Sequence, residues 1–192
     1  MSLPSIVLIG PSKAGKTTLA RALGEATGWP WLDLDKLRWD YYAEIGYDPA
    51  LADAHRRHGG IVELARYWRP FDVYGVERVL HDYPTGHVIA FGAGHSYYDA
   101  PGLFRRARKA LAPFPHVILL LPSPDIVVSA AELERRLRES EPDMEEISIR
   151  GIMAMNRTFL THPSNARLAK RTVYTLGKSI DELVTELLYG RK

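Results

Sequence analysis

The sequence contains no cysteine among its 192 residues. This absence excludes disulfide bonds, thiolate metal sites and a cysteine nucleophile, and it gives no reason to place the chain in an oxidising compartment. Long hydrophobic runs are also missing, since no apolar stretch approaches the roughly 20 residues of a membrane helix. The N-terminal run SIVLIG is too short for a signal-peptide core. We therefore expect a cytoplasmic protein without a membrane partner.

The chain carries little net charge of either sign. Its 25 basic and 23 acidic residues give a formal charge of +2, which is far below that of a typical nucleic-acid-binding protein. The one basic run, RRARK at 105–109, is typical of the solvated face of a helix. With 46% hydrophobic and 25% charged residues, the composition indicates an ordinary soluble globular protein. We expect one domain, residues 1–192, acting as a monomer or homodimer and binding no nucleic acid.

Short apolar runs alternate with segments of helical spacing. Strands are predicted at 6–9, in WPWLDLD at 29–35, and at 87–91, 116–121 and 172–175. Helices are predicted over 17–26, over 103–111, from a cap at Ser123 or Asp125 to about 139, over about 148–160, and from Ser179 to 188. Residues 36–83 read as helical or irregular. The alternation predicts a three-layer α/β fold, with a parallel five-stranded sheet and helices on both faces.

A glycine-bounded loop joins the first strand to the first helix. Its residues, Gly10, Pro11, Ser12, Lys13, Ala14, Gly15, Lys16 and Thr17, fit the pattern GxxxxGK[ST] of P-loop NTPases. Glycine is needed where a Cβ would crowd an anion, and the helix N-terminus, including Thr18, offers unpaired N–H groups to phosphate. We expect Lys16 to reach the β- and γ-phosphates and the Thr17 hydroxyl to bind Mg²⁺. The loop therefore predicts a nucleoside-triphosphate site.

Two acidic residues, Asp33 and Asp35, close the second predicted strand. Ligands bind at the carboxyl ends of strands in open α/β sheets, and alternation along a strand would point both carboxylates to one side. Asp33 is then a candidate for holding the metal, and Asp35 for binding and deprotonating an acceptor hydroxyl. The alternative is that the pair caps the helix that begins near Lys36.

The stretch IVLIGPSKAGKTTLARALGEATGWPWLDLDKL resembles the first third of shikimate kinase and related small-molecule kinases of the nucleoside-monophosphate-kinase type. The resemblance implies a P-loop kinase with an acceptor-binding lobe at 36–84 and a lid at 139–150. Looser matches imply that Gly92, Ala93 and Gly94 meet the acceptor and γ-phosphate, that Arg69 and Arg157 bind the acceptor or γ-phosphate, and that Arg136 flanks adenine. Arg157 is thereby also a catalytic candidate, with Lys16 and Asp35. His95, directly after the glycine segment, is a further candidate for acceptor contact.

Several positions depart from that family. Ala93 stands where the family has a glycine, Asp72 where it has a glutamate, and the lid sequence 139–146 holds five acids and no lysine or arginine. A lid arginine stabilises the transferring phosphoryl group, so Arg135, Arg136, Arg138 or Arg150 would have to replace it. We therefore expect poor activity on shikimate.

The region 29–98 holds 14 of the 19 aromatic residues. An acceptor with an apolar or planar surface is thus as plausible as a small polyhydroxy acid, although aromatics packing a helical lobe would explain many of them. The sequence favours an ATP- and Mg²⁺-dependent kinase acting on a small hydroxyl compound. The alternative is a regulatory P-loop ATPase without an acceptor, for which a second acidic residue facing an acceptor would have no purpose.

Overall fold

The computed structural model describes residues 3–190. Its strands are β1 (Ile6–Ile9), β2 (Trp31–Asp33), β3 (Val88–Ala90), β4 (Val117–Leu121) and β5 (Arg171–Tyr174). The helices are α1 (Lys16–Thr27), α2 (Leu34–Glu44), α3 (Pro49–Asp82), the short 3₁₀ helix η1 (Ala93–Ser96), α4 (Pro101–Leu111), α5 (Ile126–Ser140), α6 (Glu146–Thr161), α7 (Ser164–Leu168) and α8 (Ile180–Tyr189).

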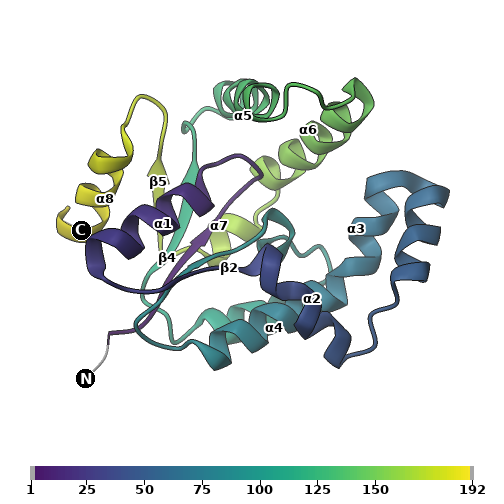
Figure 1. The fold of residues 1–192 in the computed structure, drawn as a ribbon, viewed down its shortest axis with the longest axis horizontal. Coiled ribbons are helices and arrows are strands. Elements are labelled where there is room, and N and C mark those ends of the chain that lie inside the picture. The colour runs from purple at the N-terminus through teal and green to yellow at the C-terminus, as the bar shows by residue number, and fades with distance from the viewer. Residues whose placement is uncertain (1–2, 191–192) are drawn as a thin grey trace.

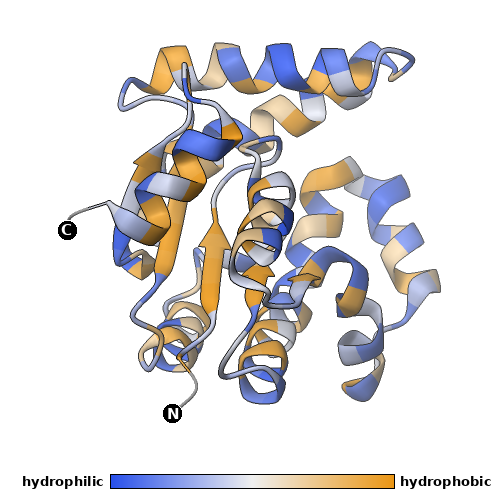
Figure 2. Cartoon of the chain, turned by 60° about the vertical axis from the view of Figure 1, so that its left-hand side comes forward, coloured by the Kyte–Doolittle hydropathy of each residue, from blue (hydrophilic) through white to orange (hydrophobic). Residues whose placement is uncertain are grey.

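The five strands form one parallel sheet in the order β2-β3-β1-β4-β5 (Figure 1). β1 lies at the centre because all four of its residues are apolar and buried. Side chains alternate along a strand, so Val7 and Ile9 join one core while Ile6 and Leu8 join the other. Figure 2 shows the strands as a hydrophobic layer between helices. The predicted three-layer P-loop fold is confirmed.

Each face of the sheet has its own set of helices. Residues of α2, α3, α4 and α7 build the core that contains Val7 and Ile9, and residues of α1, α5, α6 and α8 build the core that contains Ile6 and Leu8. Within residues 3–190, no helix combines the length and the apolar composition needed to cross a membrane.

The sequence predicts no definite elements for residues 36–83, which lie between β2 and β3. In the structure this segment forms two helices, α2 and α3. α2 and α3 pack against each other, and α3 changes direction at Gly59 and Gly60, whose backbone angles are not helical. Gly60 has φ 64° and ψ −153°, a conformation that favours glycine. The two arms of α3 lie on the side of the molecule away from α8 (Figure 1).

Two short elements, η1 and α7, have no counterpart in the sequence prediction. Several boundaries also shift: α4 begins at Pro101, whose fixed φ suits the first helical turn, and α6 begins at Glu146. β2 ends at Asp33 instead of extending to Asp35. This last shift changes the geometry of the site.

Candidate functional site

A cleft of about 1070 Å³ lies at the carboxyl ends of the central strands. It is lined by the glycine-bounded loop and the start of α1, by Asp35 and Arg38 of α2, by the second arm of α3, by the segment after β3, and by α6. Arg136, Thr175 and Lys178 line it from α5 and the β5–α8 connection. One cleft therefore collects most of the residues that the sequence singles out.

The loop between β1 and α1 has the backbone of a nest for an anion. Gly10 and Gly15 have φ values of 137° and 94°, and Lys13 also has a positive φ of 63°. A Cβ on Gly10 would collide with the carbonyl oxygen of Leu120 in β4. The N-terminus of α1 has no side-chain cap, so its first N–H groups and its positive dipole end remain available to a phosphate.

Lys16 is buried beneath this loop. Its ammonium donates hydrogen bonds to the carbonyl oxygens of Gly10 at 2.9 Å and Pro11 at 2.7 Å. Burial lowers the pKa of Lys16 to about 8, an effect that the negative charges of Asp35 and Asp33 oppose. The lysine therefore keeps its charge at neutral pH and stands beside the phosphate nest.

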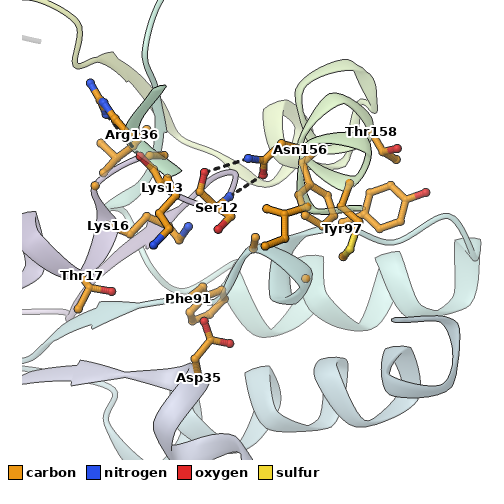
Figure 3. Close-up of a pocket in the computed structure, with 18 of the residues that line it drawn as sticks. Ser12, Lys13, Lys16, Thr17, Asp35, Phe91, Tyr97, Arg136, Asn156 and Thr158 are labelled. Carbon is orange, nitrogen blue, oxygen red and sulfur yellow. Dashed lines mark hydrogen bonds between the residues drawn. The ribbon is translucent and has the colours of Figure 1, made fainter. Parts of the chain in front are cut away.

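Asn156 of α6 fixes the loop from the other side of the cleft. Its Oδ1 accepts from the Ser12 N–H at 2.9 Å and its Nδ2 donates to the Ser12 carbonyl at 3.2 Å (Figure 3). The side chain is fully buried. The sequence analysis missed this residue, because a single asparagine in an amphipathic helix carries no motif.

Asp33 and Asp35 differ from the arrangement expected along a strand. Asp33 caps α2, and its Oδ1 accepts from the Asp35 N–H at 3.1 Å. The cap alternative is thus right for Asp33, and the argument from strand alternation is wrong because the helix begins at Leu34. Asp33 lies outside the cleft lining. Asp35 lies within it, with half of its side chain exposed, opposite the loop (Figure 3).

Arg38 is the second residue that the sequence analysis missed. It pairs with Asp35 at 3.2 Å and lies over the rings of Trp39 and Trp68, at 4.3 and 4.7 Å from the ring centroids. Its i+3 spacing from Asp35 on a helix is the signal that could have identified it.

The segment after β3 brings the backbone close to two carboxylates. A Cβ on Gly92 would collide with the carboxylate of Asp35, and a Cβ on Gly94 would stand 3.3 Å from Oδ2 of Asp72. Ala93 and Gly94 line the cleft. The close approach of these two acidic side chains explains why both positions are occupied by glycine.

The predicted arginines occupy different environments. Arg69 lines the cleft, pairs with Asp99 and stacks at 4.8 Å on Tyr97. Arg136 also lines it, pairs with Glu132 at 2.7 Å and contacts the Thr175 hydroxyl at 3.3 Å. Arg157 is exposed on α6 and lies outside the cleft lining, so the structure does not bring it together with the others.

In the predicted lid, residues 139–150, three of the five acids pair with basic neighbours. Glu139 pairs with Arg135 at 2.6 Å, Glu146 pairs with Arg138 and Arg150, and Glu141 pairs with Lys13 of the loop at 2.9 Å. Three of the four arginines considered as lid replacements are therefore engaged with acids outside the cleft. Only Arg136 of that group lines it.

Most aromatic residues of the α2–α3 region pack against one another. Trp39, Tyr42, Tyr47, Tyr67 and Phe71 form a network of ring contacts with centroids 5.2–5.8 Å apart. Of the 14 aromatics between 29 and 98, only Trp68, Phe91 and Tyr97 line the cleft. Packing thus explains most of that enrichment.

The described residues hold no group of three or more His, Cys, Asp or Glu side chains suited to a metal ion. Mg²⁺ that binds with a nucleotide uses one or two protein ligands together with phosphate oxygens and water. Thr17 and, on the opposite side of the cleft, Asp35 are the groups that could hold this Mg²⁺.

Solved structures share this fold over nearly the whole chain. A shikimate kinase from Acinetobacter baumannii in complex with shikimate is 21% identical, with a TM-score of 0.64 and coverage of 97% of this chain and 91% of that one. A shikimate kinase from Bacteroides thetaiotaomicron is also 21% identical, with a TM-score of 0.58 and coverage of 96% and 95%.

A gluconokinase from Sinorhizobium meliloti is 19% identical to this chain, with a TM-score of 0.59 and coverage of 99% and 93%. No protein-family model matches the chain, and no curated protein sequence matches it. The chain has the P-loop kinase fold of shikimate kinases, as the sequence resemblance predicts.

Proposed function

We propose that the protein transfers the γ-phosphoryl group of ATP to a hydroxyl of a small molecule. One observation carries the proposal: the uncapped N-terminus of α1 and Lys16 face the same cleft as the half-exposed Asp35. Phosphate-binding groups and a candidate base thus stand on opposite sides of one space (Figure 3). Phosphoryl transfer needs this arrangement, because its catalysis is mainly positioning and charge stabilisation.

Each residue has a chemical role in this proposal. The loop amides and Lys16 hold the β- and γ-phosphates, and Asp35 accepts the proton of the acceptor hydroxyl as its oxygen bonds to phosphorus. The bond to the β-phosphate oxygen breaks, and ADP leaves. Thr17 would hold Mg²⁺ bound with ATP, and the ion would neutralise phosphate charge; Asp33, which caps α2 outside the cleft lining, would reach the ion only through water.

The acceptor and the adenine occupy different ends of the cleft. The lobe 36–84 and the segment 92–94 hold the acceptor, with Arg69 and Arg38 as the nearest guanidinium groups, and Arg136 flanks the adenine. The cleft lining includes Ile61, Val62 and Ala65 of α3 and Ile152 and Met155 of α6, so an acceptor with some apolar surface fits it. Residues 139–150 serve as the lid, and Arg157 could join the cleft only through movement of α6.

The neighbouring shikimate kinases do not make shikimate the expected acceptor. A carboxylate on the acceptor would need an arginine that is free to pair with it, whereas Arg69 already pairs with Asp99 and Arg38 with Asp35. We expect kcat/KM for shikimate well below about 10⁴ M⁻¹ s⁻¹, the lower end of the usual range for enzymes. Efficient turnover of millimolar shikimate in a coupled ADP-release assay would overturn this expectation.

A screen of hydroxyl-bearing metabolites, nucleosides and antibiotics tests the function. ADP release is measured with ATP and Mg²⁺, for the wild type and for Lys16→Ala. The proposal requires at least one compound that raises ADP release and becomes phosphorylated. A slow ATPase that no acceptor accelerates would instead support the regulatory alternative.

A further inference from the structure

A buried histidine side chain lies next to the cleft, and the proposed reaction gives it no role. His95 lies in η1 directly after Gly94, only 1% of it is exposed, and it does not line the cleft. From its position after the glycine segment, it was a candidate for contact with the acceptor. The structure places it behind Asp35 instead.

The Nε2 side of the ring faces two polar groups. Nε2 is 3.3 Å from the Tyr42 hydroxyl and 3.4 Å from Oδ1 of Asp72, and that hydroxyl donates to the same carboxylate. Asp72 and Tyr42 are both buried. The Tyr98 hydroxyl donates to the His95 carbonyl at 2.8 Å. These contacts fix both the ring and its backbone.

The Nδ1 side of the ring faces Asp35. Nδ1 is buried and has no hydrogen-bond partner, and Oδ1 of Asp35 is 3.9 Å away. An unpaired buried ring nitrogen is costly. His95 is held by its neighbours, whereas half of the Asp35 side chain is exposed. A rotation of the Asp35 carboxylate can therefore close this gap.

Two glycines that precede His95 make this arrangement possible. Gly92 leaves room for the Asp35 carboxylate and Gly94 leaves room for that of Asp72. The backbone of η1 thus allows one imidazole to stand between two acids, one buried and one facing the cleft.

We propose that His95 is a positioning residue for Asp35: its Nδ1–H donates to Oδ1 of Asp35. Together with Arg38, which pairs with the same oxygen, it turns Oδ2 toward the acceptor hydroxyl. Asp72 and Tyr42 hold the ring from its Nε2 side. This inference rests on the proposed function, because the orientation of Asp35 affects turnover only if Asp35 receives the proton.

The nitrogen signals of His95 test the bond directly and need no acceptor. The full-length protein is labelled with ¹⁵N-histidine, and the His95 signals are identified by their absence in His95→Gln. We expect a protonated Nδ1 whose signal shifts in Asp35→Asn and does not shift in Asp33→Asn. An unprotonated Nδ1, or one that does not respond to Asp35→Asn, would overturn the proposal.

Two substitutions separate positioning from packing. Asparagine carries its amide nitrogen where Nδ1 stands, and glutamine carries one where Nε2 stands. We expect His95→Asn to keep most of the turnover, and His95→Gln to lower kcat about 10- to 100-fold with the KM for ATP unchanged, as for a misplaced reacting group. Thermal unfolding of both variants confirms that they are folded. If His95→Gln kept more turnover than His95→Asn, the main role of His95 would be to support Asp72, which would contradict the proposal.

Turnover is measured as phosphoryl transfer to the acceptor found in the screen. If the screen finds none, it is measured as transfer of the phosphoryl group to water. If the wild type binds ATP but both variants match its turnover, the positioning role fails while the kinase function stands. If the wild type binds no ATP at all, the proposed function fails and the positioning role falls with it.

Discussion

At the scale of single residues, Lys16 combines burial with a positive charge. Its folded-state pKa of about 8 lies below the ordinary lysine value because burial disfavours the ammonium. The unfolded chain therefore binds more protons than the native one between about pH 8 and 10.5. The cost of burying the charge is present in full below pH 8 and is relieved as the pH rises through that window.

The same titration predicts how ATP affinity depends on pH. Above pH 8 unliganded Lys16 loses its charge, so the affinity measured by calorimetry should fall between pH 7 and 9. Lys16→Arg should bind more weakly but with a flat profile, since a guanidinium stays charged throughout. Lys16→Ala should abolish turnover. Parallel pH profiles for the wild type and Lys16→Arg would show that Lys16 does not face the phosphates.

Asp35 carries the second residue-scale prediction. Asp35→Asn should preserve ATP binding and lower kcat by roughly 10²- to 10⁴-fold, the range of a positioned general base. Calorimetry gives the affinity, and turnover with an identified acceptor gives kcat. A large loss of ATP affinity with little change in kcat would make Asp35 a metal ligand instead.

The two aspartates illustrate what a sequence can and cannot specify. The motif spacing identifies Lys16 and Thr17, because backbone geometry and residue type are coupled in the phosphate loop. The residue types in Asp33-Leu34-Asp35 do not predict where the strand ends. In the structure Leu34 is buried in the core, and the helix begins there, directly after Asp33. A shift of two residues in that boundary turns one acid into a cap and leaves the other at the cleft.

At the scale of elements, α6 supports the phosphate loop through Asn156. Asn156→Ala would leave the N–H and carbonyl of Ser12 without these bonds, a loss of about 1–3 kcal/mol for buried groups. We expect lower thermal stability and weaker ATP binding. Asn165→Ala is the matched control, because Asn165 is also buried but bonds to the Phe159 carbonyl. If both variants bound ATP as the wild type does, Asn156 would be purely structural.

The predicted lid contacts the phosphate loop through the Lys13–Glu141 ion pair. Glu141→Gln should free Lys13 for the phosphates and tighten ATP binding up to about fivefold at low salt, since exposed pairs contribute about 0.2–1 kcal/mol. Glu145→Gln removes the same charge from a side chain for which no ion pair is seen in the described structure, so it serves as control. Equal effects of the two variants would show that the loss of one negative charge, and not the release of Lys13, changes the affinity for ATP.

The sequence of the predicted lid does not reveal how its acidic side chains are paired. Five acids in eight residues predict a segment that repels ATP, yet Glu139 and Glu146 pair with arginines of α5 and α6 that lie four or eight positions away along the chain. Charge counted along a segment differs from charge in space. The acidic lid is therefore compatible with a nucleotide at the loop, although its arginines are engaged elsewhere.

At the scale of the whole molecule, the parallel sheet and its helices follow from periodicity, because buried parallel strands are continuous apolar runs. The lobe between β2 and β3 does not follow, since its helices are held by aromatic contacts between distant positions such as Trp39 and Trp68. The network around His95 of η1 is likewise built from residues of α2 and α3 that only the fold brings together.

The central claim is that one cleft holds both ATP and a hydroxyl acceptor. The most direct measurement follows γ-labelled phosphate from ATP in the presence of Mg²⁺ and the compounds of the acceptor screen. The account predicts label on an acceptor hydroxyl, lost in Lys16→Ala and strongly reduced in Asp35→Asn. Label that appears only as inorganic phosphate, at the same rate with and without every acceptor, would contradict it.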